Sequence, residues 1–197
     1  MESKKQNILI VNGGKAFQMS GGKLSASLVE LAEKILVEKG YPVKTTKCDK
    51  EYDIKAELEL FKWADVVIWQ VLVWWMQVPW TVKKYIDEVF FAGHGILYES
   101  DGRTRKDPTK LYGSGGLCQN KKFMVSSTWN APYESLHEPG QFFNQRGPDE
   151  VLYPFRACMG MLAFQELPHI AFNDVIKNPQ YEQYVKTYTE HLNKFFP

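Results

Sequence analysis

The amino-acid sequence predicts an α/β fold in which a five-stranded parallel sheet carries helices on both faces. Strand-like and helix-like segments alternate along the 197 residues, as they do in chains built from strand–helix–strand units. Residues 7–12 and 64–71 contain continuous apolar runs, as expected for strands buried on both faces. No repeat or linker interrupts the pattern, so residues 1–197 are predicted to form a single domain.

Local signals place each element in turn. Apolar residues from Leu24 to Leu36 recur at helical spacing, and Gly40 is a natural helix stop. Pro79 can open a helix at its first turn, where its missing N–H costs nothing. The predicted strands are 7–12, 41–48, 64–71, 121–130 and 169–176. The predicted helices are 24–36, 54–63, 80–91, 154–164 and 179–196, and long loops span 94–120 and 131–149.

Composition excludes several classes of protein. The formal net charge is +1 with lysine and arginine spread along the chain, which argues against a nucleic-acid-binding surface. The first apolar run is too short for a signal peptide. The uncharged segment 66–82 is too short and too interrupted for a transmembrane helix. Cys48, Cys118 and Cys158 form no close pair, which is typical of reduced thiols in a cytoplasmic protein.

In such a sheet the ligand binds beyond the carboxyl ends of the strands, near the point where strand order reverses. For a flavodoxin-like three-layer sandwich, with strand order 2-1-3-4-5, that point lies between the first and third strands. The loops after Asn12, Val71 and Asn130 are therefore the candidate binding loops.

The first of these loops places Ser20, Gly21 and Gly22 at the start of a helix. Exposed N–H groups and the helix dipole favour a phosphate there. Neither a Rossmann nor a P-loop motif is present. An equally good interpretation is that Ser20 caps the helix and the glycines only turn the chain.

The second loop follows Trp69, which we expect in the core. Adjacent Trp74 and Trp75 cannot both point inward from one regular segment, so at least one should face a cavity or a partner. A planar flavin ring would fit against such a wall, although core packing is the simpler explanation.

The third loop offers Thr128, Trp129 and Asn130, whose backbone could meet the other edge of a bound ring, or could simply turn the chain. His137 is a candidate catalytic residue from its place in this loop, although surface histidines are commoner. No histidine lies in a zinc-binding motif, so no metal site is predicted. Basic residues at 103–106 could hold the 2′-phosphate of NADPH, although a solvated loop is the commoner case.

The strings "WADVVIWQ", "PWTVKKYID", "SDGRTRKDP", "YGSGGL", "TWNAP" and "NDVIK" resemble bacterial NADPH:quinone oxidoreductases of the flavodoxin-like quinone-reductase group. The resemblance covers nearly the whole chain. It implies a cytoplasmic homodimer with its active site near the subunit interface, and FAD as cofactor, or FMN in its place. Such enzymes take a hydride from NADPH onto the flavin and pass two electrons to a quinone in a ping-pong cycle, which protects against quinone and oxidative stress.

The resemblance also implies cofactor contacts. Those expected to hold the flavin phosphates are Ser20, Gly21, Gly22, Lys23, Leu24, Ser25, Ala26 and Ser27. Those expected along the isoalloxazine ring are Val73, Trp74, Trp75 and Met76 on one edge, and Thr128, Trp129, Asn130 and Ala131 on the other. Tyr112 is expected to contact the cofactor. For the mechanism, the hypothesis is that Trp74 or Trp75 and Trp129 help form an apolar slot for the nicotinamide and the quinone. Tyr133 or His137 would donate a proton to the quinol, unless solvent does.

The chain departs from the resembled pattern in one loop. Leu72-Val73 stands where relatives have Pro-Gly, and Gln77-Val78 where they have Gly-Ala. The backbone conformation of this loop and the substrate preference are therefore the properties in which this chain is most expected to differ from them.

Two other functions use the same fold. One is a flavin-dependent azo- or nitroreductase; the other is a flavodoxin-type electron carrier, which the near-neutral charge disfavours.

Overall fold

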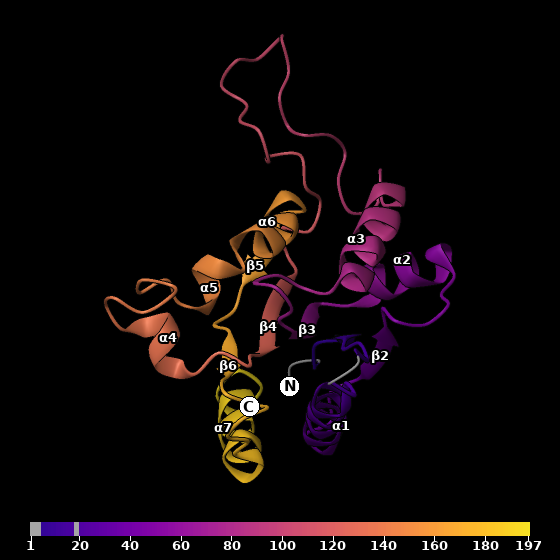
Figure 1. Ribbon diagram of the computed structural model, residues 1–197. Helices are drawn as coiled ribbons and strands as arrows, with labels where there is room; N and C mark the ends of the chain where they lie inside the picture. Colours follow the sequence, from indigo (N-terminus) through magenta and orange to yellow (C-terminus); the bar gives the residue numbers. More distant parts are fainter. Residues whose placement is uncertain (1–4, 18–19) are drawn as a thin grey trace.

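The strand β3 (Val66–Leu72) is buried along all of its 7 residues and lies inside the sheet. The computed structural model describes residues 5–17 and 20–197 (Figure 1). A strand without water on either side must pair its backbone groups with neighbouring strands. β3 does so in parallel with β1 (Ile8–Gly13) and with β4 (Lys122–Thr128).

The sheet has the order β2-β1-β3-β4-β5. β6 also pairs with β4, further along that strand than β5 does. The predicted order 2-1-3-4-5 is confirmed. The prediction of one strand at 169–176 is wrong in its bounds, because the fifth position is filled by β5 (Gln165–Glu166) and β6 (Ile170–Phe172), which face the two ends of β4. Pro168 lies between them and has no N–H to continue the pairing. On the other side of the sheet, β2 is Val43–Lys47.

Helices cover both faces of the sheet, as predicted, because successive strand residues point to opposite sides. Figure 1 shows α1 and α7 on one face and α2, α3 and α6 on the other. The loop predicted at 131–149 contains one short helix, α4, and the start of a second, α5, neither of which the sequence revealed. The bounds are α1 Lys23–Glu38, α2 Ile54–Trp63, α3 Trp80–Ala92, α4 Tyr133–His137, α5 Pro148–Val151, α6 Tyr153–Met161 and α7 Tyr181–Phe195.

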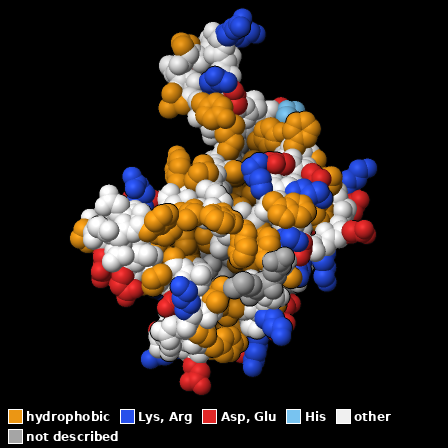
Figure 2. Space-filling model, in the orientation of Figure 1, with side chains coloured by type: hydrophobic (Ala, Val, Ile, Leu, Met, Phe, Trp, Pro, Cys, Tyr) orange, Lys and Arg blue, Asp and Glu red, His pale blue; other side chains and the backbone are white. Residues whose placement is uncertain are grey.

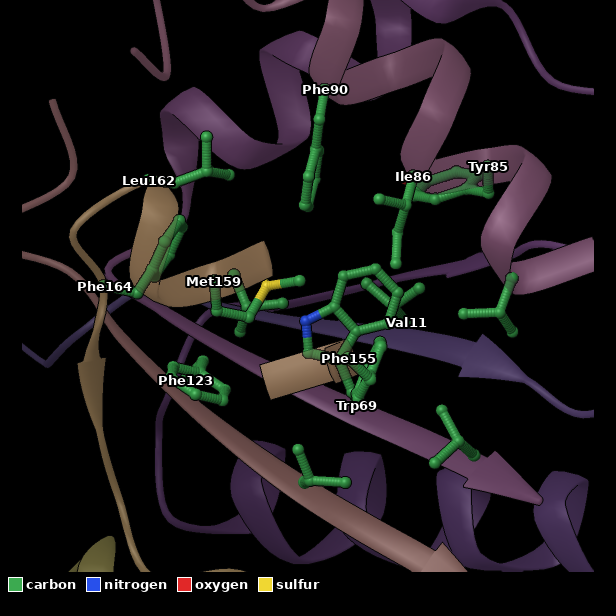
Figure 3. Close-up of a cluster of buried hydrophobic side chains, with 14 of the residues drawn as sticks. Val11, Trp69, Tyr85, Ile86, Phe90, Phe123, Phe155, Met159, Leu162 and Phe164 are labelled. Atoms are coloured by element: carbon green, nitrogen blue, oxygen red, sulfur yellow. The ribbon is translucent and has the colours of Figure 1, made fainter. Parts of the chain in front are cut away.

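Trp69 is fully buried at the centre of the larger core, as expected (Figure 3). The centroid of its ring lies 5.4 Å from that of Phe155, with the ring planes at 89°, and 6.1 Å from that of Tyr85, with the planes at 81°. Edge-to-face pairs of this kind stabilise a core beyond the burial of their area. They fix α3 and α6 on the same face of the sheet.

Residues 94–117 form an arm that leaves the body of the molecule after α3 and returns before β4 (Figure 1). At its base Gly116 lies against the end of α6, where the Cys118 N–H donates to the Leu162 carbonyl at 3.0 Å. A Cβ on Gly116 would lie 2.2 Å from the carbonyl carbon of Leu162. Only glycine fits at this contact.

Across residues 5–17 and 20–197, no helix has the length and apolar character to cross a membrane.

We expect Gly116→Ala to lower the free energy of unfolding by about 1–3 kcal/mol, because the new methyl group must displace backbone atoms. Gly160→Ala is the matched control, since nothing lies within 4 Å of its Cβ position on α6. Removing a helical glycine there should raise stability by about 0.5–1 kcal/mol. Urea unfolding of both variants measures the two changes; a Gly116→Ala protein as stable as the wild type would contradict the contact.

Candidate functional site

The carboxyl ends of β1, β3 and β4 meet at one edge of the sheet, where the Val73 N–H donates to the Thr128 carbonyl at 2.9 Å. A cavity of about 630 Å³ opens there. Figure 2 shows apolar side chains gathered across the middle of one face of the molecule. The cavity is lined by Phe17, Ser20, Leu72, Val73, Trp74, Trp75, Met76, Thr128, Trp129, Asn130, Ala131, Phe143, Val175 and Ile176.

Many of the residues expected to hold a cofactor come together in this cavity. They are Ser20, Val73, Trp74, Trp75, Met76, Thr128, Trp129, Asn130 and Ala131. The other residues of the first group do not line it; Gly21, Gly22, Lys23, Leu24, Ser25, Ala26 and Ser27 follow Ser20 into the start of α1.

The loop after β3 is a tight hairpin turn. The Trp74 N–H donates to the Gln77 carbonyl at 2.8 Å, and the Gln77 N–H donates to the Trp74 carbonyl at 3.2 Å. Between them Trp75 has φ 49° and Met76 has φ 61°, the left-handed pair of a type I′ turn, which ordinarily holds Asn-Gly. Val73 keeps a negative φ, so valine in place of glycine imposes no strain of its own.

This turn separates the two adjacent tryptophans. The Trp74 ring stacks on Phe17, with centroids 4.2 Å apart and planes 5° apart. Trp75 is 84% exposed. The prediction that both cannot point inward is confirmed. Trp74 and Phe17 form a stacked aromatic pair in the lining of the cavity, and Trp75, which also lines it, is largely open to solvent.

The loop after β4 supplies the floor of the cavity. Trp129 is only 1% exposed, and its indole N–H donates to the Ser127 hydroxyl at 2.8 Å. Its backbone N–H donates to the Phe172 carbonyl, also at 2.8 Å. Trp129 is thus largely a core residue that shows one edge to the cavity. The N–H groups of Asn130 and Ala131 have no backbone acceptor among the described residues.

The first loop folds back on itself before α1 begins. Phe17 and Ser20 exchange backbone hydrogen bonds at 2.8 and 2.9 Å. The N-cap of α1 is Gly22 in the left-handed conformation, with φ 67° and no side-chain cap. The alternative that Ser20 caps the helix is therefore wrong. The first-turn N–H groups have no intrahelical acceptors, and the first turn itself carries no acidic residue. This arrangement fits a phosphate.

Three predicted site residues lie elsewhere. Tyr133 and His137 pack together on α4, with ring centroids 4.0 Å apart, and neither lines the cavity. Tyr112 lies on the arm and is 69% exposed. It lines a separate groove of about 620 Å³, between α3, α6 and the arm. Arg103 lies over its ring at 5.2 Å and pairs with Asp101, so the basic residues at 103–106 also lie on the arm.

No ionisable side chain is among the described residues that line the cavity. Groups with shifted pKa values lie elsewhere. Burial and a hydrogen bond to Glu57 raise the pKa of Tyr85 between α2 and α3. A hydrogen bond from His169 at 2.7 Å lowers the pKa of Asp149 beside β5. Across the described ranges, no three His, Cys, Asp or Glu side chains gather as metal ligands would.

Five lining residues were not predicted: Phe17, Leu72, Phe143, Val175 and Ile176. Phe17 and Leu72 belong to loops that were already candidates, and a wider choice of residues would have included them. Val175 reaches the site because its N–H donates to the Trp129 carbonyl at 3.0 Å. Phe143 arrives from the segment between α4 and α5, for which the sequence carries no signal.

The sheet order and the position of the cavity are those of a flavodoxin-like α/β domain, and the comparisons with known proteins agree. A family model described as "Flavodoxin-like fold" matches residues 6–192. The chain belongs to the flavodoxin-like family.

Among individual relatives, the NADPH:quinone oxidoreductase MdaB (modulator of drug activity B) of Haemophilus influenzae is 50% identical over 190 residues, covering 96% of this chain and 99% of that protein. The resemblance to that group of quinone reductases is confirmed. An uncharacterised protein of Schizosaccharomyces pombe is 44% identical, covering 96% of each chain.

Solved structures of lower identity share the fold. The FMN-dependent NADH-azoreductase of Bacillus anthracis, solved in complex with FMN, superposes with a TM-score of 0.69. It is 11% identical, with 98% of this chain and 100% of that chain covered.

The left-handed turn carries a stability prediction. Met76→Gly should raise the free energy of unfolding by up to about 1 kcal/mol, because the strain of a left-handed side-chain residue exceeds the entropic cost of glycine. Gln77→Gly, in the same turn but with a negative φ, should lower it. Thermal unfolding of the two cofactor-free variants measures the difference. Equal changes in both would show that the turn is not strained.

Proposed function

We propose that the protein is a flavin-dependent NADPH:quinone oxidoreductase. The observation that carries this proposal is the cavity itself. Its described lining is mostly apolar, includes a stacked aromatic pair and has no ionisable side chain, and it lies at the edge of the sheet where flavodoxin-like proteins bind their ligand. The name of the Haemophilus influenzae relative supports the same activity.

The residues present fit a flavin. Residues 20–27 would hold its phosphates through the uncapped start of α1. Residues 73–76 and 128–131 would hold the two edges of its ring between the loops after β3 and β4. We propose FAD, from the resemblance, with FMN as the alternative. A bound flavin supplies a ring that accepts a hydride and gives up two electrons.

The chain itself then has three tasks: to position the ring, to exclude water and to offer one apolar slot. NADPH and the quinone would occupy that slot in turn, which is the basis for a ping-pong order. Reduction of quinones by two electrons at once suits a protective role under quinone and oxidative stress. An azo- or nitro-compound could use the same slot, and the fold shared with an azoreductase keeps that acceptor as the alternative.

The experiment that tests this function begins with the visible absorbance spectrum of the purified protein. The protein should be yellow from bound flavin, and chromatography of the released cofactor should identify FAD. Stopped-flow mixing with NADPH should bleach the flavin absorbance, and menadione should restore it. Initial rates at several menadione concentrations should give parallel double-reciprocal lines.

Each alternative has its own outcome. A protein that binds neither FAD nor FMN refutes the proposal. Bleaching that no quinone reverses indicates an electron carrier. Faster turnover of methyl red than of menadione indicates an azoreductase.

The quinol proton is assigned to solvent, because the described lining offers no ionisable side chain. Tyr133→Phe and His137→Asn should therefore each keep kcat/KM for menadione within about twofold of the wild type, well below the roughly 10²–10⁴-fold contribution of a general acid. A loss of that larger size in either variant would restore the residue to the role that its place in the loop suggested.

The protein is proposed to act as a homodimer in which Tyr112 serves the cavity of a second copy. What supports this is its position: the resemblance assigns Tyr112 to the cofactor, yet it lies on the arm, outside the cavity of its own chain. Figure 2 shows the arm standing away from the body. Large apolar side chains near its base, such as Phe91 at 81% exposed, would be covered by a partner.

Light scattering should then give a mass about twice 22.8 kDa. Tyr112→Ala should weaken flavin binding about tenfold, the loss of one aromatic contact of about 1.4 kcal/mol. Tyr181→Ala, at an exposed position on α7, is the control and should leave binding unchanged. Fluorescence titration of the apoproteins with flavin measures both. A monomeric protein with unchanged affinity in Tyr112→Ala would contradict the dimeric site.

A further inference from the structure

One part of the cavity lining belongs to no motif and to no contact implied by the resemblance. Phe143 lies on the segment between α4 and α5, and its side chain is half-buried against both the larger core and the cavity. Its neighbour Phe142 is 74% exposed and does not line the cavity. Two adjacent residues of the same type therefore have different environments.

Contacts on several sides hold Phe143 in place. Its N–H donates to the Ser135 carbonyl at 3.1 Å, and its carbonyl accepts from the Arg146 N–H at 3.1 Å. Its ring packs edge-to-face against Trp129, with ring centroids 6.2 Å apart and planes at 89°. It packs in the same way against Phe142, with centroids 4.8 Å apart and planes at 90°. Phe143 is thus fixed to the residue that forms the floor of the cavity.

The backbone after Phe143 is strained in a way that keeps this position. Asn144 has φ 48° and Gln145 has φ 64°, a left-handed pair that costs free energy in residues with side chains. Strain of this kind persists only where the surrounding contacts determine the conformation. Here it reverses the chain directly behind Phe143.

A phenyl ring in this position can contribute shape and apolar contact only, since it neither donates a hydrogen bond nor carries a proton. The flavin contacts implied by the resemblance come from the loops after β1, β3 and β4, and from Tyr112. What is left for Phe143 is the second molecule in the slot. We propose that Phe143 limits the size of the ring system that the cavity accepts, an inference that rests on the proposed quinone-reductase function.

The test compares a two-ring acceptor, menadione, with a three-ring acceptor, 9,10-phenanthrenequinone. In Phe143→Ala the ratio of kcat/KM for the larger quinone over the smaller should rise about tenfold, within the range that pocket size gives. In Phe143→Trp the same ratio should fall. Phe142→Ala is the matched control and should keep the wild-type ratio. Because NADPH would use the same slot, the rate of flavin bleaching by NADPH is measured separately, and the ratio between the two quinones is the quantity that tests Phe143.

Calorimetric titration of the oxidised proteins with each quinone gives a readout independent of turnover, and the ratio of dissociation constants should change in the same direction. Phe143→Trp keeps the half-buried volume filled, so it decides the matter if Phe143→Ala fails to fold. Ratios within twofold of the wild type in the Phe143 variants, with an active wild type, would overturn the inference and leave the proposed function standing. A wild type that reduces neither quinone would overturn the proposed function, and the binding ratios would then decide on Phe143 alone.

Discussion

The site depends on the backbone pairing of β3. Because the strand is buried along its whole length, its N–H and C=O groups have no access to water and must be satisfied by β1 and β4. Val66 pairs with Lys122 at one end of the β3–β4 ladder and Leu72 with Thr128 at the other. This register ends the strands at one level, so their loops meet around a common space. A slip by one residue would turn every side chain of β3 to the opposite face.

The lining of that space is consistent with the proposed function, in which the cofactor would supply the chemistry and the chain would position it. Acid–base groups with shifted pKa values, such as Tyr85 and Asp149, lie within the protein or at its edge and not along the cavity. What the chain provides at the site is a stacked aromatic pair, the buried Trp129 and, among the described residues, backbone N–H groups at 130 and 131 without a backbone acceptor. These are features that position a ring and keep water away from it.

The parts predictable from the sequence are those with a local cause. Continuous apolar runs mark β1 and β3, apolar periodicity marks α1, and strand–helix alternation marks the candidate loops. The rest depends on contacts distant in sequence. A helix as short as α4 forms only with tertiary support, and nothing in the string Trp-Trp-Met-Gln announces a left-handed turn. Phe143 enters the site only through its packing on Trp129. The place of Tyr112 follows from the path of the arm.

The arm has a consequence for the lifetime of the chain. It contributes no strand to the sheet, and at its exposed far end it carries Arg103, Arg105 and Lys106. Exposed, irregular segments are the sites at which proteases cut folded proteins. A trypsin-like protease could therefore nick the arm and leave the sheet and both cores folded. Resistance to digestion is then determined by how completely the arm is covered, and only secondarily by the stability of the core.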